Sequence, residues 1–283
     1  MKKLVRPKCI PVGYLRLALS QRFGYTVFKM KSVEAEIEAR LSRAEREHGV
    51  RILFAIESGS RAWGFASPDS DYDVRFIYAR PAEWYLSLDL EHRRDVIEYP
   101  IEDDIDLNGW DVRKALTLFW RSNPAFVEWV RSPIVYREDG AFLDQVLTLL
   151  PQAYSPRAGF YHYRSMAVSN SAYVAGDSVR LKKYLYVLRP LLAMRWLIAH
   201  GTPPPVEFDA MRSLVSSDAA VTRAIEELLV KKKASGEVGE GPPVPELSDF
   251  IASELARPVP ELPDRGAAAD YSKLNDLFRS SLH

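Results

Sequence analysis

The chain has 283 residues, of which 47% are hydrophobic and 27% are charged. Its 38 basic and 38 acidic side chains give a formal net charge of zero, a composition typical of a globular protein with a sizeable core rather than a disordered chain. The single cysteine, Cys9, excludes an intrachain disulfide and a cysteine metal cluster, and no apolar run approaches the roughly 20 residues of a membrane-spanning helix.

Residues 1–29 carry seven Lys or Arg and no acid, and they show little periodicity. No long apolar segment follows them, which argues against a secretory signal and, with the single cysteine, indicates a cytoplasmic protein. The pattern indicates a basic arm, or a start codon placed too far upstream with Met30 as the alternative start. From Ser32 to Gly49, apolar residues recur at helical spacing, which predicts a helix with Ser32 as its N-cap.

The following segment mixes strand and helix patterns. A buried strand is expected at residues 50–56, and a second strand at residues 72–79 follows a turn-rich loop. Two more strands are expected at residues 95–101 and 104–107. Helices are then expected at residues 112–121, 124–131 and 142–150. This half therefore predicts a small mixed β-sheet flanked by helices.

Beyond residues 151–156 the pattern is helical throughout, and helices are expected at residues 157–175, 178–199 and 208–233. A Gly-, Pro- and Glu-rich linker at residues 235–245 precedes short C-terminal helices. We therefore predict an α+β protein with four units. They are a basic N-terminal arm at 1–31, the mixed α/β domain at 32–150, a helical domain at 151–234, and a linker with C-terminal helices at 235–283.

Two carboxylates are placed for metal binding on the second expected strand. Asp71 and Asp73 are two residues apart, so the alternation of a strand puts both on one face. Two such carboxylates repel each other unless a cation lies between them. Because oxygen ligands suit hard cations, the pair indicates Mg²⁺ or Mn²⁺.

The Gly59-Ser60 turn comes directly after the first expected strand. Glycine lets the backbone approach a phosphate closely, and backbone amides with a serine hydroxyl can cradle its oxygens. Arg61 and Arg75 each have two readings, pairing with the carboxylates or binding phosphate. Trp63 either packs the loop or stacks on a nucleotide. A Gly-Ser turn or an acidic strand face alone is usually unremarkable in function, but together in this order they indicate a phosphate and metal site.

This order, Gly-Ser followed after ten residues by Asp-x-Asp on a strand, resembles the DNA polymerase beta nucleotidyltransferase superfamily. The chain also contains five longer strings: Gly-Ser-Arg-Ala-Trp-Gly-Phe (59–65), Ser-Asp-Tyr-Asp-Val-Arg (70–75), Gly-Trp-Asp-Val-Arg-Lys-Ala-Leu (109–116), Ser-Pro-Ile-Val-Tyr (132–136) and Lys-Lys-Tyr-Leu-Tyr-Val-Leu-Arg-Pro (182–190). These strings are similar to one branch of the superfamily, the RlaP-type predicted nucleotidyltransferases, named for an association with RNA ligase and RNA repair. The resemblance covers roughly residues 32–208 and implies a polymerase-beta-like fold.

The superfamily resemblance also implies a third acid on a later strand. Asp104 and Asp106 share a face of the strand expected at 104–107. Apolar neighbours on both sides of Asp106 favour it, and Asp104 is the alternative. Asp111 directly precedes an expected helix, so we expect it to cap that helix.

Lys182, Tyr186 and Arg189 lie on one face of an expected helix, at positions i, i+4 and i+7. A solvated cationic face is one reading. The resemblance implies instead that Lys182 and Lys183 reach the triphosphate of a nucleotide. Tyr184 and Tyr186 could stack on a base, or they could belong to the core or its rim.

We therefore expect a metal-dependent nucleotidyltransferase with Asp71, Asp73 and Asp106 as catalytic and metal-binding residues. The nucleotide-binding residues are expected to be Gly59, Ser60, Arg61, Arg75, Lys182 and Lys183. The substrate would be an NTP, the cofactor Mg²⁺ or Mn²⁺, and the acceptor an RNA end, with a functional link to an RNA ligase implied by the branch resemblance. Two alternatives stay open, namely a protein or small-molecule acceptor, and a non-catalytic nucleotide- or RNA-binding module.

Overall fold

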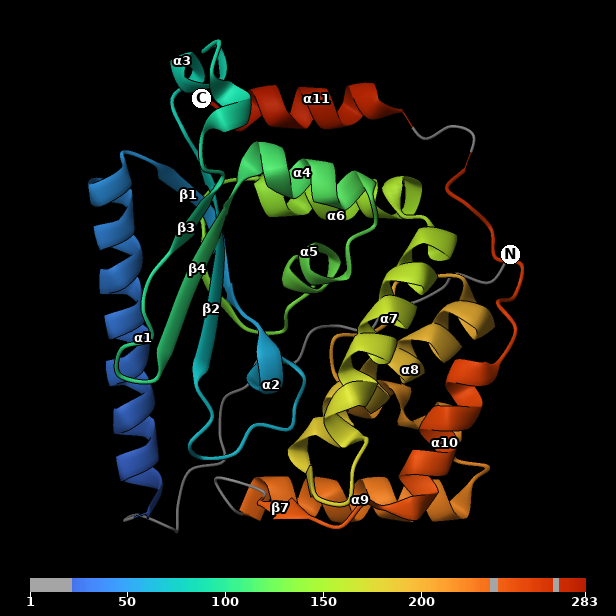
Figure 1. The fold of residues 1–283 in the computed structure, drawn as a ribbon. Coiled ribbons are helices and arrows are strands. Elements are labelled where there is room, and N and C mark those ends of the chain that lie inside the picture. Colours follow the sequence, from blue (N-terminus) through green and yellow to red (C-terminus); the bar gives the residue numbers. More distant parts are fainter. Residues whose placement is uncertain (1–21, 235–238, 267–269) are drawn as a thin grey trace, which may run out of the picture.

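The computed structural model describes residues 22–234, 239–266 and 270–283 (Figure 1). Five strands form one mixed sheet: β1 (Arg51–Glu57), β2 (Tyr72–Ala79), β3 (Val96–Glu98), β4 (Ile105–Asp111) and β5 (Val135–Glu138). Their order across the sheet is β3-β4-β2-β1-β5. β2 and β4 are parallel neighbours, whereas the other adjacent strands pair antiparallel.

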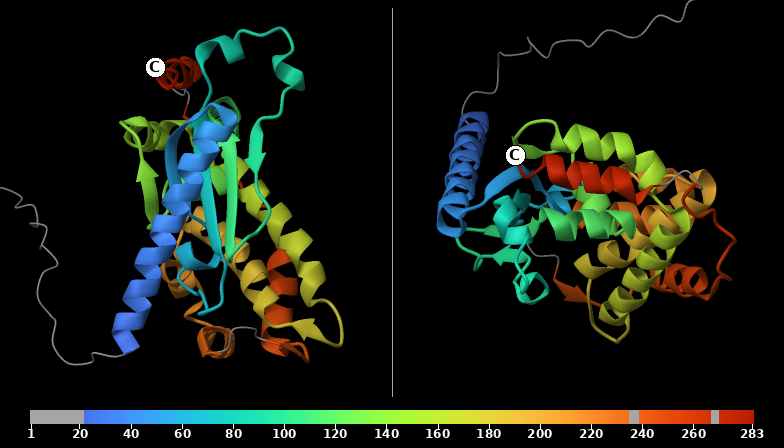
Figure 2. Two further views of the ribbon diagram at one scale, coloured as in Figure 1. Left: turned by 90° about the vertical axis from the view of Figure 1, so that its left-hand side faces the viewer. Right: turned by 90° about the horizontal axis from the view of Figure 1, so that it is seen from above.

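Helices cover both faces of this sheet (Figures 1 and 2). The long helix α1 (Arg22–His48) lies along one face, and the opposite face is covered by α4 (Val112–Trp120), α5 (Pro124–Trp129) and α6 (Phe142–Ala153). Short elements occupy the connections: α2 (Gly59–Ala62), α3 (Ala82–Tyr85) and the 3₁₀ turn η1 (Leu90–His92). The small mixed sheet flanked by helices that the sequence predicts is confirmed.

The second half is mainly helical and packs beside the sheet on the side away from α1 (Figure 1). Its elements are α7 (Pro156–Ser171), η2 (Ala172–Val174), β6 (Val179–Arg180), α8 (Lys182–His200), η3 (Asp209–Val215), α9 (Ala219–Ala234), β7 (Glu240–Gly241), α10 (Pro245–Ala256) and α11 (Tyr271–Ser280). Helix α11 returns to the first half and packs against α4 and α6. Within the described residues, no helix combines the length and the apolar character needed to cross a membrane.

The alternation of β2 divides its side chains between two apolar cores. Val74, Phe76 and Tyr78 are buried against α1 in the smaller core. Ile77, on the other face, belongs to a larger core that runs from β1 through α4, α5 and α6 into α7, α8, α9, α10 and α11. Asp73 and Arg75 share the face of Ile77, because side chains two apart on a strand point the same way. The carboxylate face of the sheet is therefore the one that meets the helical half.

Helix α1 begins earlier than the sequence pattern predicts. We expect Ser32 to cap it, but the helix begins at Arg22 and Ser32 lies inside it. Between Arg22 and Lys31 there is no proline and only one glycine, Gly24, so nothing stops the helix from extending. The basic-arm prediction for residues 1–21, and the linker prediction for residues 235–238, fall outside the described residues.

Three further expectations need correction. Gly59–Ala62 forms a short helical turn within the loop. Asp104 precedes β4 in a turn, at φ +61°, and is not part of the strand, which begins at Ile105 and extends to Asp111. The second half is not wholly helical, because β6 pairs antiparallel with β7 and α8 begins only at Lys182. In the last case, pairing with the distant strand β7 overrides the local helical pattern.

Candidate active site

The register of β2 and β4 brings two of the predicted carboxylates together. Asp73 on β2 is the direct partner of Asp106 on β4. The guanidinium of Arg75 lies between them, with Nη2 2.6 Å from Asp106 Oδ2 and 3.1 Å from Asp73 Oδ1. Asn108 Nδ2 donates to the other Asp106 oxygen at 2.6 Å. Carboxylates from two adjacent strands thus converge on one positive group.

Asp73 lies among charges of both signs. Burial raises the pKa of Asp73, Arg75 lowers it, and the negative charges of Asp106 and Asp71 raise it again. Asp71 itself lies just ahead of β2 and is exposed. Asp104 is also exposed, and only its backbone oxygen, which accepts from the Tyr72 amide at 2.7 Å, contacts β2. Of the two candidates for the third acid, the structure places Asp106 beside Asp73.

The Gly59 turn lies directly against the Asp73 carboxylate. A Cβ atom at Gly59 would be 1.9 Å from Asp73 Oδ2, and Gly59 has φ +60°, in the left-handed region. The amide of Ser58 donates to the Asp73 backbone oxygen at 2.8 Å. The side chain of Ser60 is buried, and its hydroxyl makes no hydrogen bond within the described ranges. A glycine is therefore required for turn and carboxylate to meet.

Glu57 holds the backbone of Asp73 in place, a role that the sequence pattern did not predict. Its side chain is fully buried, with Oε1 accepting from the Asp73 amide at 2.8 Å and Oε2 accepting from the Tyr136 hydroxyl. Burial raises the pKa of Glu57 to about 7, against the lowering effect of the hydrogen bond from Tyr136. The sequence feature that could have indicated this role is a glutamate at the end of an apolar strand, directly before the Gly-Ser turn.

The two arginines of the motif have different contacts. Arg75 pairs with the carboxylates, as one of its two readings predicts. Arg61 instead donates to the backbone oxygens of Ser70 and Asp71, and its guanidinium stacks 3.7 Å from the centre of the Tyr72 ring. Arg61 therefore holds the loop that leads into β2. Phosphate binding by either arginine stays a prediction.

Helix α8 brings an aromatic and cationic edge to the carboxylates. Burial, and after it the negative charges of Asp73 and Asp71, raise the pKa of Tyr186, whose ring makes an edge-on contact with Trp63 at the end of α2. Lys183 Nζ is 5.0 Å from the centre of the Tyr186 ring and 4.7 Å from that of Tyr173. Lys182, the first residue of α8, is partly exposed beside it. Tyr186 therefore lies at the rim of the core, next to the predicted metal site, as one of the alternatives for this residue predicts.

The face that carries Lys182 and Tyr186 is not a solvated cationic face, because Arg189 on it is buried. Arg189 Nη1 is 2.7 Å from Glu128 Oε1 on α5, and its guanidinium lies 4.6 Å from the Trp63 ring centre. Glu128 also accepts from the Tyr163 hydroxyl at 2.9 Å and from Trp63 Nε1 at 3.4 Å. This network packs Trp63 between the two halves of the protein.

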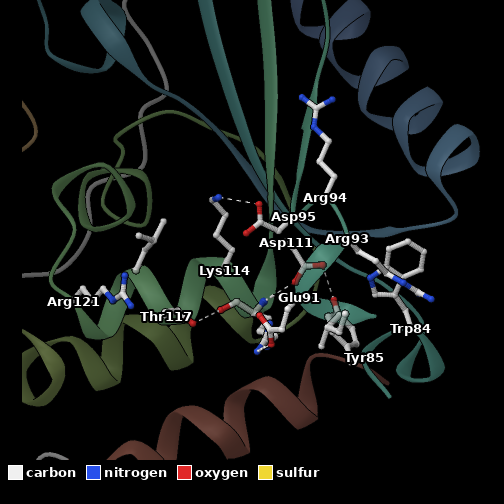
Figure 3. Close-up of a pocket in the computed structure, with 13 residues that line it drawn as sticks. Trp84, Tyr85, Glu91, Arg93, Arg94, Asp95, Asp111, Lys114, Thr117 and Arg121 are labelled. Atoms are coloured by element: carbon white, nitrogen blue, oxygen red, sulfur yellow. Dashed lines mark hydrogen bonds and ion pairs between the residues drawn. The ribbon is translucent and has the colours of Figure 1, made fainter. Parts of the chain in front are cut away.

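A pocket of 330 Å³ lies at the Asp111 end of β4, away from the carboxylate pair (Figure 3). Asp111 lies five residue steps along β4 from Asp106, about 17 Å of extended chain. Asp111 accepts from the Arg113 amide at 2.8 Å and from the Tyr85 hydroxyl at 3.0 Å, which confirms its predicted role as a helix cap. Lys114 points toward Asp95 and pairs with it at 2.9 Å. Ion pairs that tie the segment around α3 to α4 therefore line this pocket, away from the carboxylate pair.

The donor set of the carboxylate pair fits a hard divalent cation. Asp73 and Asp106 present only oxygen atoms, and both already bind the positive charge of Arg75. The described residues contain no group of three or more His, Cys, Asp or Glu side chains arranged to hold a metal ion. Arg75 Nη2 lies between the two carboxylates, within 3.1 Å of an oxygen of each.

Comparison with known proteins identifies the family. The RlaP family, described as the RNA repair pathway DNA polymerase beta family, matches residues 33–280. The uncharacterized protein YcgL of Bacillus subtilis is 45% identical over 218 residues, which cover 77% of this chain and 83% of YcgL. A crystal structure of a nucleotidyltransferase-like protein from Exiguobacterium sibiricum aligns over 88% of this chain and 77% of that chain, with 13% identity and a TM-score of 0.31, which is too distant to support an argument. On the family match and the identity to YcgL, the chain belongs to the RlaP family of polymerase-beta-like nucleotidyltransferases.

Proposed function

We propose that this protein transfers a nucleoside monophosphate from an NTP to an acceptor hydroxyl and releases pyrophosphate. The observation that carries the proposal is the parallel register that sets Asp73 opposite Asp106, with the Gly59 turn against Asp73. Membership of a nucleotidyltransferase family supports the same reaction class. The turn would receive the phosphates, and the carboxylates would hold the metal next to them.

Asp71, Asp73 and Asp106 would bind Mg²⁺ or Mn²⁺. A bound divalent cation would neutralise charge on the attacking and leaving oxygens of the phosphoryl transfer. Asn108 would keep the Asp106 carboxylate in orientation, since it already donates to Oδ1. Glu57 would fix the backbone of Asp73 through its hydrogen bond to the amide.

The phosphates of the NTP would be bound by groups on both sides of the carboxylates. On the sheet side, the Ser60 hydroxyl would donate to a phosphate oxygen, beside the backbone of Gly59. From the helical half, Lys182 and Lys183 would neutralise the triphosphate charge. Arg75 and Arg61 are the two further cations close enough to the turn to contribute.

We extend the proposal to an RNA end as acceptor, in the cytoplasm and in a pathway that also uses an RNA ligase. The family description supports an RNA-related role. The residues from 155 to 200 also support it, because they contain seven Lys or Arg and one acid. A protein or small-molecule acceptor, and a binding module without activity, are the outcomes that the experiment must separate from it.

The test uses purified protein, one α-labelled NTP at a time, Mg²⁺ or Mn²⁺, and three acceptor pools: mixed RNA, small molecules and protein. We expect metal-dependent label transfer to RNA. Asp73→Asn and Asp106→Asn should each reduce transfer by about 10²-fold or more. The matched control is Asp104→Asn, an exposed residue that should leave transfer unchanged. Transfer to another pool would replace the acceptor, and NTP binding without transfer to any pool would leave only a binding module.

A further inference from the structure

A pocket of 280 Å³ opens beside the Gly59 turn, between α2, α5 and α7. Its walls combine apolar and polar side chains, namely Trp63, Trp129, Met166, Asn123, His162 and Ser165. Neither the family match nor the similarity to YcgL says anything about these residues. We refer to it below as the α5–α7 pocket.

The α5–α7 pocket begins one residue away from the predicted reaction centre. Ser58 lines it, and the Ser58 amide donates to the Asp73 backbone oxygen at 2.8 Å. The next residue, Gly59, contacts the Asp73 carboxylate. One residue of the chain therefore separates the wall of the pocket from the turn at which the phosphates are proposed to bind.

The apolar walls of the pocket are suited to a flat aromatic ring. The Trp63 indole is fixed by the Arg189 guanidinium on one side and by an edge-on contact with Tyr186, at 5.7 Å between ring centres. The Trp129 indole packs on Trp110, with ring centres 4.0 Å apart. Rings held in this way need not be ordered when a ligand binds, and stacking of a base on an aromatic side chain contributes about 1–3 kcal/mol.

Polar groups at the mouth of the pocket leave hydrogen-bonding capacity for a ligand. Asn123 Oδ1 caps α5 by accepting from the Phe126 amide at 3.3 Å, while its Nδ2 has no acceptor among the described residues. His162 Nε2 is 3.1 Å from the Arg121 backbone oxygen. Because a carbonyl oxygen only accepts, Nε2 must carry the proton, and Nδ1 of the neutral ring is an acceptor. An amide donor and an imidazole acceptor match the paired donors and acceptors on the edge of a nucleobase.

Two other pockets of similar size are less suited to this role. The 330 Å³ pocket at the far end of β4 is lined by ion pairs and lies away from the carboxylates. A pocket of 350 Å³ is lined by Arg61, Tyr72 and Tyr136. Tyr72 points to the opposite face of β2 from Asp73, so this pocket opens on the other side of the strand.

We propose that the α5–α7 pocket receives the nucleoside of the NTP, with the base against the indoles and its edge toward Asn123 and His162. The inference rests on the proposed function, because it assumes that the phosphates bind at the Gly59 turn. It makes Asn123, His162 and Ser165 the residues that determine which base is accepted. They act by positioning the nucleotide and take no part in the chemical step.

The test fills the pocket from its exposed side. Ser165→Trp places an indole in the mouth, and the matched control is Ser169→Trp, one turn further along α7 and also exposed. Calorimetry measures binding of the four non-hydrolysable NTP analogues and of inorganic tripolyphosphate, with Mg²⁺ present. We expect Ser165→Trp to weaken analogue binding at least tenfold and to leave tripolyphosphate binding unchanged, while Ser169→Trp changes neither.

A second variant checks the polar mouth without filling it. Asn123→Asp keeps the oxygen that caps α5 and removes the Nδ2 donor, so we expect it to change the order of preference among the four analogues. If Ser165→Trp binds every analogue as the wild type does, the nucleoside assignment is wrong and the proposed reaction stands. If the wild type binds neither the analogues nor tripolyphosphate, the proposed function fails and the pocket assignment fails with it.

Discussion

Asp73 and Asp106 are register partners on two parallel strands, and a single guanidinium nitrogen of Arg75 binds a carboxylate oxygen of each. A side chain of the protein thus provides the positive charge that the proposed metal would provide. We therefore expect both Arg75 and a divalent cation to raise the free energy of unfolding, each compensating in part for the absence of the other.

Removing Arg75 should therefore make the protein more dependent on metal. In EDTA, we expect Arg75→Ala to lower the free energy of unfolding by about 1–3 kcal/mol, because two partly buried carboxylates lose their charged partner. Mg²⁺ should restore more stability to Arg75→Ala than to the wild type. Urea unfolding with and without Mg²⁺ measures both effects. The control is Arg94→Ala, whose exposed ion pair with Glu98 should contribute about 0–1 kcal/mol. An equal Mg²⁺ response in wild type and Arg75→Ala would contradict the metal assignment of Asp73 and Asp106.

Gly59 should be required for the position of Asp73, beyond its backbone conformation. Gly59→Ala adds a Cβ atom 1.9 Å from Asp73 Oδ2 in addition to the strain of a positive φ. Gly49 has the same φ of +60°, but a Cβ atom there would have no neighbour within 4 Å. We expect both variants to lose about 1–2 kcal/mol of stability from backbone strain. Only Gly59→Ala should also abolish nucleotide transfer in the labelling assay. Similar transfer by the two variants would show that the contact with Asp73 is not needed.

Removing one partner of the buried ion pair between Arg189 and Glu128 should strongly lower the free energy of unfolding. Arg189→Met leaves the Glu128 carboxylate buried without its cation, so we expect a loss of about 3–5 kcal/mol in urea unfolding. Combining Arg189→Met with Glu128→Met removes both charges, and the loss should become smaller than for either single variant. A double variant as unstable as the sum of the two would show that the charges are not coupled.

The free energy of unfolding should change with pH in part through the titration of Asp111. Burial raises the pKa of Asp111 above its ordinary value, against the lowering effect of its hydrogen bonds from Arg113 and Tyr85. Above about pH 4 the folded protein therefore holds this proton more tightly than the unfolded chain does, so the contribution of Asp111 to stability falls as pH rises through the raised pKa. Asp111→Asn keeps the capping oxygen and has no proton to lose.

The measurement for Asp111 compares urea unfolding of the wild type and Asp111→Asn from pH 4 to 7. We expect the difference in free energy of unfolding to shift in favour of Asp111→Asn as pH rises. Asp111→Ala is the control for the cap itself and should be about 1–3 kcal/mol less stable than Asp111→Asn at every pH, because it leaves the Tyr85 hydroxyl and the Arg113 amide without their acceptor. Parallel pH curves for wild type and Asp111→Asn would contradict the raised pKa.

Periodicity alone located the strand that carries the site. The alternation from Tyr72 to Ala79 predicts β2 with the bounds that the structure has, since one face of this strand is buried against α1. The preference for Asp106 over Asp104 also agrees with the geometry. It depended on the apolar neighbours of Asp106, which are buried because β4 lies inside the sheet.

Contacts between distant segments could not be predicted in the same way. Glu57 contacts the candidate site through the amide of Asp73 and the hydroxyl of Tyr136, which a single sequence does not place beside it. Tyr186 has the helical spacing of a core residue, and its proximity to the carboxylates depends on how α8 packs against the sheet. The start of α1 at Arg22 was mispredicted for a local reason. A helix can extend past a suitable N-cap, here Ser32, when no residue before it breaks the helix.

The larger apolar core runs without interruption from β1 through α8 to α11, so the two halves of the chain share one interior. Pulling the helical half away from the sheet would expose that interior and separate Arg189 from Glu128. We therefore expect the halves to unfold as one cooperative unit, with a single transition in calorimetry. The NTP of the proposed reaction would then enter a site whose walls are already assembled.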